Sequence, residues 1–161
     1  MEKKYKLYYK SPLGTLEIVG TAQAIFSILF VEKENIVEDE VPPVLSECYN
    51  QLDEYFKGER QEFTVPYYFE GTDFQKRVWV ALTDVPYAQT VSYKDIAVAT
   101  GNDKAVRAVG SANGKNKLSI IVPCHRIIGS NGTLTGYAGG LWRKEWLLQH
   151  EQTMKKGPSR K

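Results

Sequence analysis

Sulfur and imidazole side chains are scarce in this sequence. Its 161 residues include two cysteines, Cys48 and Cys124, and two histidines, His125 and His150. Two cysteines are too few for a disulfide framework, which excludes the small secreted proteins that depend on one. No histidine precedes His125, and Cys48 is the only cysteine in the first half, so a tetrahedral zinc site cannot be assembled there. We therefore predict no metal site.

Long hydrophobic runs are missing as well. No apolar stretch approaches the ~20 residues that an α-helix needs to cross a bilayer, so we expect no membrane partner. The N-terminal residues, from Met1 to Tyr5, have neither the apolar core nor the cleavage site of a signal peptide. A reactive thiol would need a reducing compartment, and we expect a cytoplasmic location.

The net charge is small, but the charges are unevenly distributed. A formal charge of +2 is too low to indicate nucleic-acid binding by itself. Acidic residues gather in residues 32–40, whereas the C-terminal half is rich in Lys94, Lys104, Arg107, Lys115, Lys117, Arg126, Arg143 and Lys144. This asymmetry is compatible with a C-terminal half that faces phosphates, and equally with an ordinary solvated surface.

Composition and patterning indicate two small domains and a tail. A hydrophobic content of 42% and a charged content of 25% are typical of a globular protein. We expect one domain over residues 1–70, a second over residues 71–152, and a basic tail over residues 153–161.

The first part has the pattern of a small sheet with a helix. Residues 4–10, 15–20, 24–31 and 62–68 each predict a short strand. Pro42-Pro43 opens a helix whose apolar positions recur every three or four residues, and Gly58 is suited to its C-terminal end. Cys48 lies on the apolar face of this helix, so we interpret it as a core residue rather than a catalytic one.

The second part begins with three predicted helices. Thr72 and Gln75 form a capping box for the first, which ends before Pro86. Ser92 starts the second, Gly101-Asn102 interrupts it, and Asn102 or Asp103 caps a third over about residues 104–112. A helix, a short turn with glycine and another helix are typical of a helix-turn-helix, although any helical hairpin has a similar pattern.

The third helix combines small residues with a single arginine. Ala105, Val106, Ala108 and Gly110 surround Arg107. Small side chains can serve tight helix packing. They can also let a helix backbone approach a nucleic-acid wall closely, with the arginine projecting into the base stack.

The segment Pro123-Cys124-His125-Arg126 has the residues of a reactive thiol. The β-branched run before it predicts a buried strand that Pro123 ends, which leaves Cys124 at the mouth of that strand. An imidazole and a guanidinium beside a thiol favour the thiolate, the form that acts as a nucleophile. A buried structural cysteine is the alternative, because free cysteines are often buried.

A set of motifs after residue 73 follows the order of one known family. They are Phe74-x-x-x-Val78-Trp79-x-Ala81-Leu82, Thr90-Val91-Ser92-Tyr93-x-x-Ile96-Ala97, Arg107-Ala108-Val109-Gly110, Ala112-Asn113-Gly114-Lys115-Asn116, Ile121-Val122-Pro123-Cys124-His125-Arg126-Ile127-Ile128-Gly129, Gly132-x-x-x-Gly136-Tyr137-Ala138-Gly139-Gly140-Leu141 and Lys144-Glu145-Trp146-Leu147-Leu148-x-x-Glu151. With these motifs, about half of the chain strongly resembles the O6-alkylguanine-DNA alkyltransferases.

The resemblance implies a fold as well as a family. Residues 1–70 resemble the family only in architecture. The implied fold class is α/β (α+β), with a small ribonuclease-H-like N-terminal domain and a helical C-terminal domain of winged-helix or helix-turn-helix type.

The resemblance also implies an activity, the stoichiometric transfer of a methyl or other alkyl group from O6-alkylguanine, and from O4-alkylthymine, in DNA to the protein. Cys124 would be the acceptor, and His125 would take its proton through a water molecule. Glu151 would hold the imidazolium, Asn116 would fix the cysteine loop, and Tyr93 would protonate the departing guanine. The thioether product does not hydrolyse, so the protein would be consumed in one turnover without a cofactor.

The same resemblance implies how DNA is bound. A guanine must leave the duplex before its O6 position is accessible. Arg107 would fill the gap that the guanine leaves in the base stack. The residues in contact with the minor groove would be Ala105, Val106, Ala108 and Gly110 of the third helix, together with Ser92. Residues Gly136, Tyr137, Ala138 and Arg126 would form the base pocket. The expected partner is double-stranded DNA containing alkylated guanine, bound by a monomer.

Two rival functions and two departures from the family pattern accompany this interpretation. A lesion sensor of the same fold that lacks the acceptor cysteine is opposed by Cys124 itself. A cysteine hydrolase is the other alternative, but adjacent Cys and His residues are unsuited to a papain-like arrangement, and no oxyanion-hole motif is visible.

Lys117 stands where proline is common in the family, and Tyr87 stands where glycine is frequent. His150 matches no role in the family and is expected at the surface.

Overall fold

The computed structural model describes residues 3–32, 40–134, 136–137 and 139–156. The chain divides into two compact units, Met1–Glu70 and Gly71–Lys161. Within the described residues, no helix is both long enough and apolar enough to cross a membrane.

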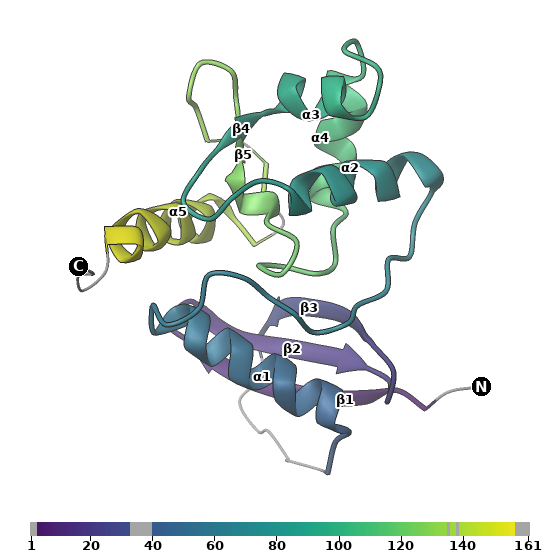
Figure 1. The fold of residues 1–161 in the computed structure, drawn as a ribbon, viewed down its shortest axis with the longest axis vertical. Helices are drawn as coiled ribbons and strands as arrows, with labels where there is room; N and C mark the ends of the chain where they lie inside the picture. Colours follow the sequence, from purple (N-terminus) through teal and green to yellow (C-terminus); the bar gives the residue numbers. More distant parts are fainter. Residues whose placement is uncertain (1–2, 33–39, 135, 138, 157–161) are drawn as a thin grey trace. The chain divides into compact units, whose positions relative to one another are not determined.

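The N-terminal unit is a three-stranded antiparallel sheet with one helix. Strands β1 (Tyr5–Ser11), β2 (Gly14–Gly20) and β3 (Ile25–Val31) are hydrogen-bonded in that order, and α1 (Pro43–Phe56) lies across one face of the sheet (Figure 1). The core is built from alternate strand positions, such as Leu16, Ile18 and Ile28, and from the apolar side of α1. These three strands and this helix were predicted from the sequence.

The helix α1 ends as its sequence indicates, but the fourth predicted strand is wrong. Gly58 has a positive φ of 80° just after the helix, a conformation that glycine adopts without steric cost. Residues 62–68 form no strand, because only Tyr67 pairs with the sheet, in an isolated bridge to Ile25. Cys48 is fully buried on α1, and burial raises the pKa of its thiol to about 12. This thiol is therefore inert at neutral pH.

The C-terminal unit begins with the predicted helices. Helix α2 (Asp73–Thr83) has a complete capping box between Thr72 and Gln75, and α3 (Tyr93–Ala99) has another between Ser92 and Asp95. In both boxes the side chains satisfy N–H groups that the first helical turn leaves unpaired. A turn then leads to α4 (Val106–Gly114), and Figure 1 shows α2, α3 and α4 grouped together. This α3–turn–α4 arrangement agrees with the predicted helix-turn-helix.

The start of α4 differs from the prediction. Neither Asn102 nor Asp103 caps it, because the N-cap residue is Ala105, which has no side-chain capping bond. Asn102 instead accepts a hydrogen bond from the Lys104 amide at 3.0 Å within the preceding turn. The Asn102 side chain therefore stabilises the turn that precedes α4 and does not cap the helix.

The apolar run before Cys124 is buried, but it is not the predicted strand. Ile120 has a φ of 73°, which is unusual for a β-branched residue and interrupts an extended conformation. The Asn116 side chain replaces the sheet partners: its amide nitrogen donates to the carbonyls of Leu118 and Val122, at 3.4 and 3.2 Å, and its oxygen accepts from the Leu118 N–H at 3.0 Å. The run is thus a folded loop organised by one asparagine.

The remaining elements of the C-terminal unit adjoin the cysteine segment. A 3₁₀ turn, η1 (Cys124–Arg126), leads into β5 (Ile127–Ile128), which pairs in parallel with β4 (Val91–Ser92). Helix α5 (Leu141–Lys156) then packs against η1. The cysteine segment therefore contacts α2 and α5, and β5 connects it to β4.

Candidate active site

Cys124 is the first residue of η1, and its side chain is 2% exposed. The side-chain amide of Asn116 donates a hydrogen bond to its sulfur at 3.3 Å. The same amide binds the loop carbonyls, so one side chain fixes both the loop and the thiol. This contact agrees with the role expected for Asn116.

A second asparagine, which the sequence reasoning did not assign, also holds the cysteine. The Asn113 side-chain amide donates to the Cys124 carbonyl at 3.4 Å. Asn113 lies in the last turn of α4, three residues before Asn116, so the end of this helix is bonded directly to the cysteine segment. The spacing of the two asparagines was visible in the sequence, but their shared target was not.

His125 and Glu151 form a buried pair. The His125 Nε2 atom lies 2.7 Å from a Glu151 carboxylate oxygen, and both side chains are completely buried. Burial lowers the pKa of His125, whereas the carboxylate opposes that change. Because an ionised carboxylate can only accept, Nε2 carries the proton, and the Nδ1 of the neutral ring is left with its lone pair.

Arg126 lies in a different place from the one expected. Its guanidinium donates to both Glu151 oxygens, at 2.8 and 2.9 Å, and to the Val85 carbonyl at 2.8 Å. With these donors engaged, the side chain holds the carboxylate. Burial would raise the pKa of Glu151, but the charges and hydrogen bonds of His125 and Arg126 hold it well below its usual range.

Lys144 is a buried cation that the sequence reasoning did not assign. Its side chain is fully buried, and its ammonium lies 5.9 Å from the centre of the Tyr93 ring. Burial lowers its pKa to about 8, an effect that the nearby Cys124 opposes. A signal was available, because Lys144, Leu147 and Glu151 follow helical spacing on one face of α5.

The electrostatics of the thiol contain opposing contributions. Burial raises the pKa of Cys124 to about 11, while the hydrogen bond from Asn116 and the charge of Lys144 lower it. The thiol is therefore protonated at neutral pH in the free protein, and a base is needed to form the nucleophile. The Nδ1 of His125 is buried and has no hydrogen-bond partner among the described residues.

The expected base-pocket residues are described only in part. Tyr137 is buried, and burial raises the pKa of its hydroxyl well above the ordinary value. Gly136 has a φ of 34°, and a Cβ built on it would lie 3.9 Å from the Tyr93 hydroxyl oxygen, so this loop lies beside Tyr93. Ala138 lies outside the described residues.

The residues expected to contact DNA gather at the starts of two helices. Arg107, Val106 and Ala108 are exposed in the first turn of α4, with Ala105 and Gly110 half-buried. Ser92 is the N-cap of α3, and Tyr93 is its first residue. A Cβ added to Gly110 would lie 3.8 Å from the Tyr93 ring, so the middle of α4 adjoins the start of α3.

Comparisons with known proteins identify the family. Residues 4–74 match the family model for the ribonuclease-like domain of 6-O-methylguanine DNA methyltransferase, and residues 73–153 match the model for its DNA binding domain. The chain belongs to the 6-O-methylguanine DNA methyltransferase family. The match over residues 4–74 extends the likeness into the N-terminal unit, where the sequence showed only an architectural resemblance.

Relatives of this family cover nearly the whole chain. A methylated-DNA--protein-cysteine methyltransferase of Methanosarcina barkeri is 43% identical over 154 residues, covering 91% of this chain and 98% of the relative. The constitutive enzyme of that name from Bacillus subtilis is 46% identical over 153 residues, covering 89% and 92%.

Solved structures of the family share the fold. The crystal structure of Mycobacterium tuberculosis O6-methylguanine methyltransferase has a TM-score of 0.87 at 41% identity, and covers 98% of this chain and 97% of that one. The M. tuberculosis protein in complex with DNA has a TM-score of 0.83 at 44% identity, covering 91% and 92%. The mixed α/β fold predicted from the sequence is confirmed.

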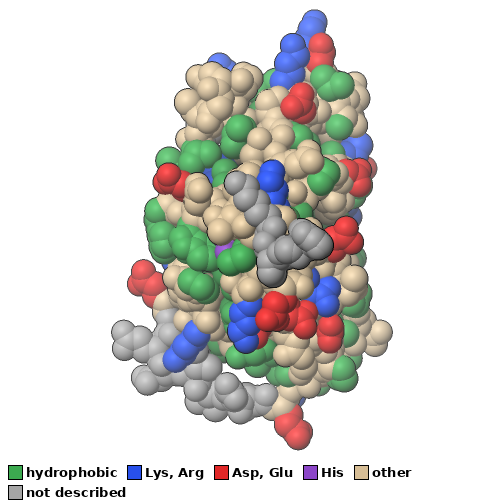
Figure 2. Space-filling view, turned by 60° about the vertical axis from the view of Figure 1, so that its left-hand side comes forward, with side chains coloured by type: hydrophobic (Ala, Val, Ile, Leu, Met, Phe, Trp, Pro, Cys, Tyr) green, Lys and Arg blue, Asp and Glu red, His purple; other side chains and the backbone are tan. Residues whose placement is uncertain are grey.

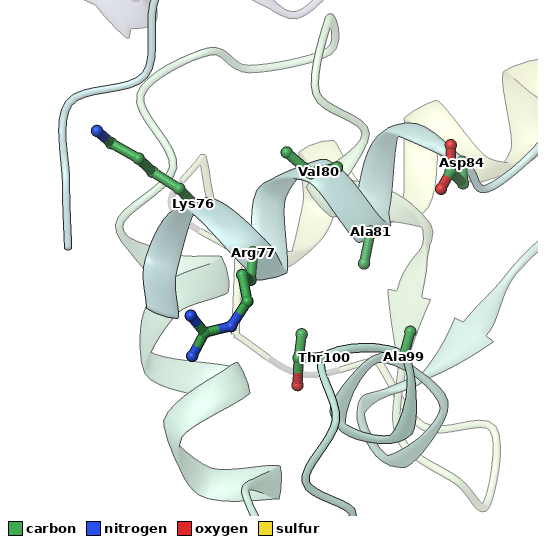
Figure 3. Close-up of a pocket in the computed structure, with 7 residues that line it drawn as sticks. All are labelled: Lys76, Arg77, Val80, Ala81, Asp84, Ala99 and Thr100. Atoms are coloured by element: carbon green, nitrogen blue, oxygen red, sulfur yellow. The ribbon is translucent and has the colours of Figure 1, made fainter. Parts of the chain in front are cut away.

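Two further features of this family member lie outside the predicted site. His150, expected at the surface, is 8% exposed and stacks on Trp146 with ring centres 4.8 Å apart. A groove of about 440 Å³ between α2 and the end of α3 is lined by Lys76, Arg77, Val80, Ala81, Asp84, Ala99 and Thr100 (Figure 3). None of the expected catalytic or DNA-contacting residues lines this groove.

One face of the molecule has a mixed distribution of charge. On the face drawn in Figure 2, Lys and Arg side chains are interspersed with Asp and Glu. Among the described residues, no group of three or more His, Cys, Asp or Glu side chains could hold a metal ion.

Proposed function

We propose that Cys124 is the acceptor of the alkyl group in this protein. The family's activity is the direct reversal of DNA alkylation by transfer to a cysteine of the protein itself. The observation that carries the assignment is the buried sulfur of Cys124 next to a His125–Glu151 pair, with Cys48 buried and inert in the other unit.

His125 is the base in this proposal. Its Nε2–H donates to Glu151, so the Nδ1 lone pair accepts the thiol proton, with a water molecule as a relay. Glu151 then stabilises the imidazolium, as the carboxylate of a nucleophile–base–orienter triad does. Arg126 keeps Glu151 ionised and in place through two hydrogen bonds.

The thiolate attacks the alkyl carbon of O6-alkylguanine, and also that of O4-alkylthymine. A carbon–sulfur bond forms while the carbon–oxygen bond breaks, and its electron pair leaves with the base. Tyr93 donates a proton to the base as it departs, and the charge of Lys144 favours the anionic sulfur before attack. The thioether product does not hydrolyse in water, so each protein molecule acts once. The reaction needs no cofactor.

Access to the lesion requires the base to leave the duplex. Arg107 fills the vacated position, and the small residues around it allow α4 to approach the minor groove. The substrate is double-stranded DNA with an alkylated guanine, whose base lies against Tyr137 in the loop of residues 132–140. The protein acts as a monomer in the cytoplasm, where its thiol remains reduced.

Intact-mass measurement tests the acceptor. With DNA containing O6-methylguanine in substoichiometric amount, one methyl group per lesion should appear on Cys124. Cys124→Ser should bind the DNA and accept no methyl group, whereas Cys48→Ala should accept it as the unchanged protein does. Methylation at Cys48, or more methyl groups removed than protein molecules present, would contradict the proposal.

A further inference from the structure

The connection between α2 and β4, residues Val85–Gln89, is bonded to the catalytic carboxylate. The Ala88 N–H donates to Glu151 Oε1 at 3.1 Å, and the Ala88 carbonyl accepts from the Gln152 side-chain amide at 2.6 Å. At its other end, the Val85 carbonyl accepts from Arg126. This segment therefore contacts both members of the Arg126–Glu151 ion pair and the residue that follows Glu151.

Ala88 adopts a strained conformation to make these contacts. Its φ is 66°, in the left-handed region that residues with a Cβ enter at a cost. Ala88 is buried, and its N–H and C=O groups bind two consecutive residues of α5. Strain of this kind persists only where the surroundings hold it, and it is concentrated at functional sites.

Four hydrogen bonds to the Glu151 carboxylate come from two parts of the C-terminal unit. His125 and Arg126 supply three donors, and the backbone of Ala88 supplies the fourth. The first three come from the cysteine segment itself. The Ala88 bond ties the carboxylate to a different part of the unit, the segment that leads into β4 and Tyr93.

We propose that Ala88 and Gln152 are positioning residues, which hold Glu151 so that it orients the His125 imidazole toward Cys124. This inference rests on the proposed function. Gln152 holds the Ala88 carbonyl, the Ala88 N–H then points at Glu151, and the carboxylate fixes the tautomer of His125. Loss of the Gln152 bond would let the carboxylate move and would make the imidazolium less stable, so the thiolate would form at higher pH.

The test compares variants at Gln152 in a Cys48→Ala background, so that Cys124 is the only thiol. Gln152→Glu has nearly the same size and no donor, Gln152→Lys keeps a donor, and Gln149→Glu is the matched control on an exposed position of α5. The measurements are the rate of methyl transfer from duplex DNA, the rate of transfer from free O6-benzylguanine, the pH dependence of Cys124 alkylation by iodoacetamide, and the melting temperature.

Gln152→Glu should slow both transfers by about threefold to tenfold, the size expected for one lost hydrogen bond. The midpoint of iodoacetamide reactivity should move to higher pH. Gln152→Lys should recover most of both effects, and Gln149→Glu should behave as the unchanged protein does.

An unchanged midpoint in Gln152→Glu would overturn the inference, whether or not the melting temperature falls, because the contact would then be structural only. Slowing confined to duplex DNA would also overturn it, since DNA binding and not the carboxylate would be affected. Failure of the proposed function would look different: the parent protein would not acquire a methyl group on Cys124.

Discussion

The pKa of Cys124 reflects burial and single residues whose effects oppose each other. Burial raises the pKa of the thiol to about 11, and Asn116 and Lys144 act against it. The contributions of Asn116 and Lys144 are too small to ionise the thiol at neutral pH. In the proposed mechanism, His125 takes the thiol proton on Nδ1, because its Nε2–H is donated to Glu151.

Replacing Lys144 with methionine should separate reactivity from stability. Lys144→Met removes a buried cation whose pKa is lowered to about 8, so the folded protein should become more stable below that pH. The stabilising charge beside the thiolate disappears as well, and transfer should slow by about tenfold, or ~1.4 kcal/mol. Thermal melts and single-turnover kinetics measure the two effects, with Lys155→Met as a control on an exposed position of the same helix. Faster transfer in Lys144→Met would refute this role.

Glu151 should make the protein sensitive to acid. Its pKa in the folded state lies below the value in the unfolded chain, so its contribution to stability is complete above about pH 4.5 and is lost as the pH falls. Glu151→Gln should lower the free energy of unfolding at pH 7 by about 3–5 kcal/mol, because Arg126 loses its buried partner. The difference from the parent protein should shrink toward pH 3.

Urea denaturation at pH 7, 5 and 3 measures this dependence. Glu145→Gln, at an exposed position of α5, is the control and should keep the parent's pH profile. If the free energy of unfolding of Glu151→Gln fell with decreasing pH as steeply as that of the parent protein, another carboxylate would be responsible for the acid sensitivity.

At the scale of elements, α4 has two different ends. Its first turn presents Arg107 and small residues to solvent, while its last turn binds the cysteine segment through Asn113. The Trp79 indole N–H donates to the Ala112 carbonyl at 2.9 Å and fixes the last turn against α2. One nine-residue helix thus presents the residues that we propose contact DNA and also donates a hydrogen bond to the cysteine segment.

This division predicts that Arg107 affects only duplex substrates. If Arg107 fills the gap left by the extruded base, Arg107→Ala raises the free-energy cost of holding the base outside the duplex by part of a few kcal/mol. Repair of duplex DNA should then slow by roughly tenfold to a thousandfold. Reaction with a free alkylated guanine should stay within a few-fold of the parent rate. His125→Ala should slow both reactions, because it acts on the thiol.

Single-turnover kinetics on both substrates and both variants provide the comparison. Equal slowing of the two substrates by Arg107→Ala would assign Arg107 to the active site or to folding, and would rule out the base-flipping role.

At the scale of the whole molecule, all the proposed chemistry belongs to the unit that begins at Gly71. The N-terminal unit contributes a sheet, a helix and an inert thiol. Its stability comes from apolar contacts such as those of Leu16, Ile18 and Leu52, which are fully buried.

Chelation should leave the protein unchanged. We predict that treatment with EDTA alters neither the transfer rate nor the melting temperature, because the first half of the chain has no histidine and one cysteine. Metal analysis of the purified protein gives an independent measurement. Stoichiometric zinc that is lost together with stability on chelation would contradict this prediction.

The sequence by itself determined the features that depend on neighbouring residues. The capping boxes at Thr72 and Ser92 are bonds between residues three apart, so their pattern is readable directly. The three strands and α1 follow from periodicity and from Pro and Gly positions, and the order of the motifs was specific enough to indicate the family and the fold.

Only the tertiary structure decided the features that depend on distant partners. Arg126 was expected in a pocket, but it is bound by Glu151, a residue 25 positions away. The run before Cys124 has the residue types of a strand, yet the Asn116 side chain supplies its hydrogen bonds and makes it a loop. Lys144 and Ala88 likewise acquire their roles from helices and loops that fold against them. Local propensity cannot encode such contacts, because their free energy arises only when separate segments exclude water together.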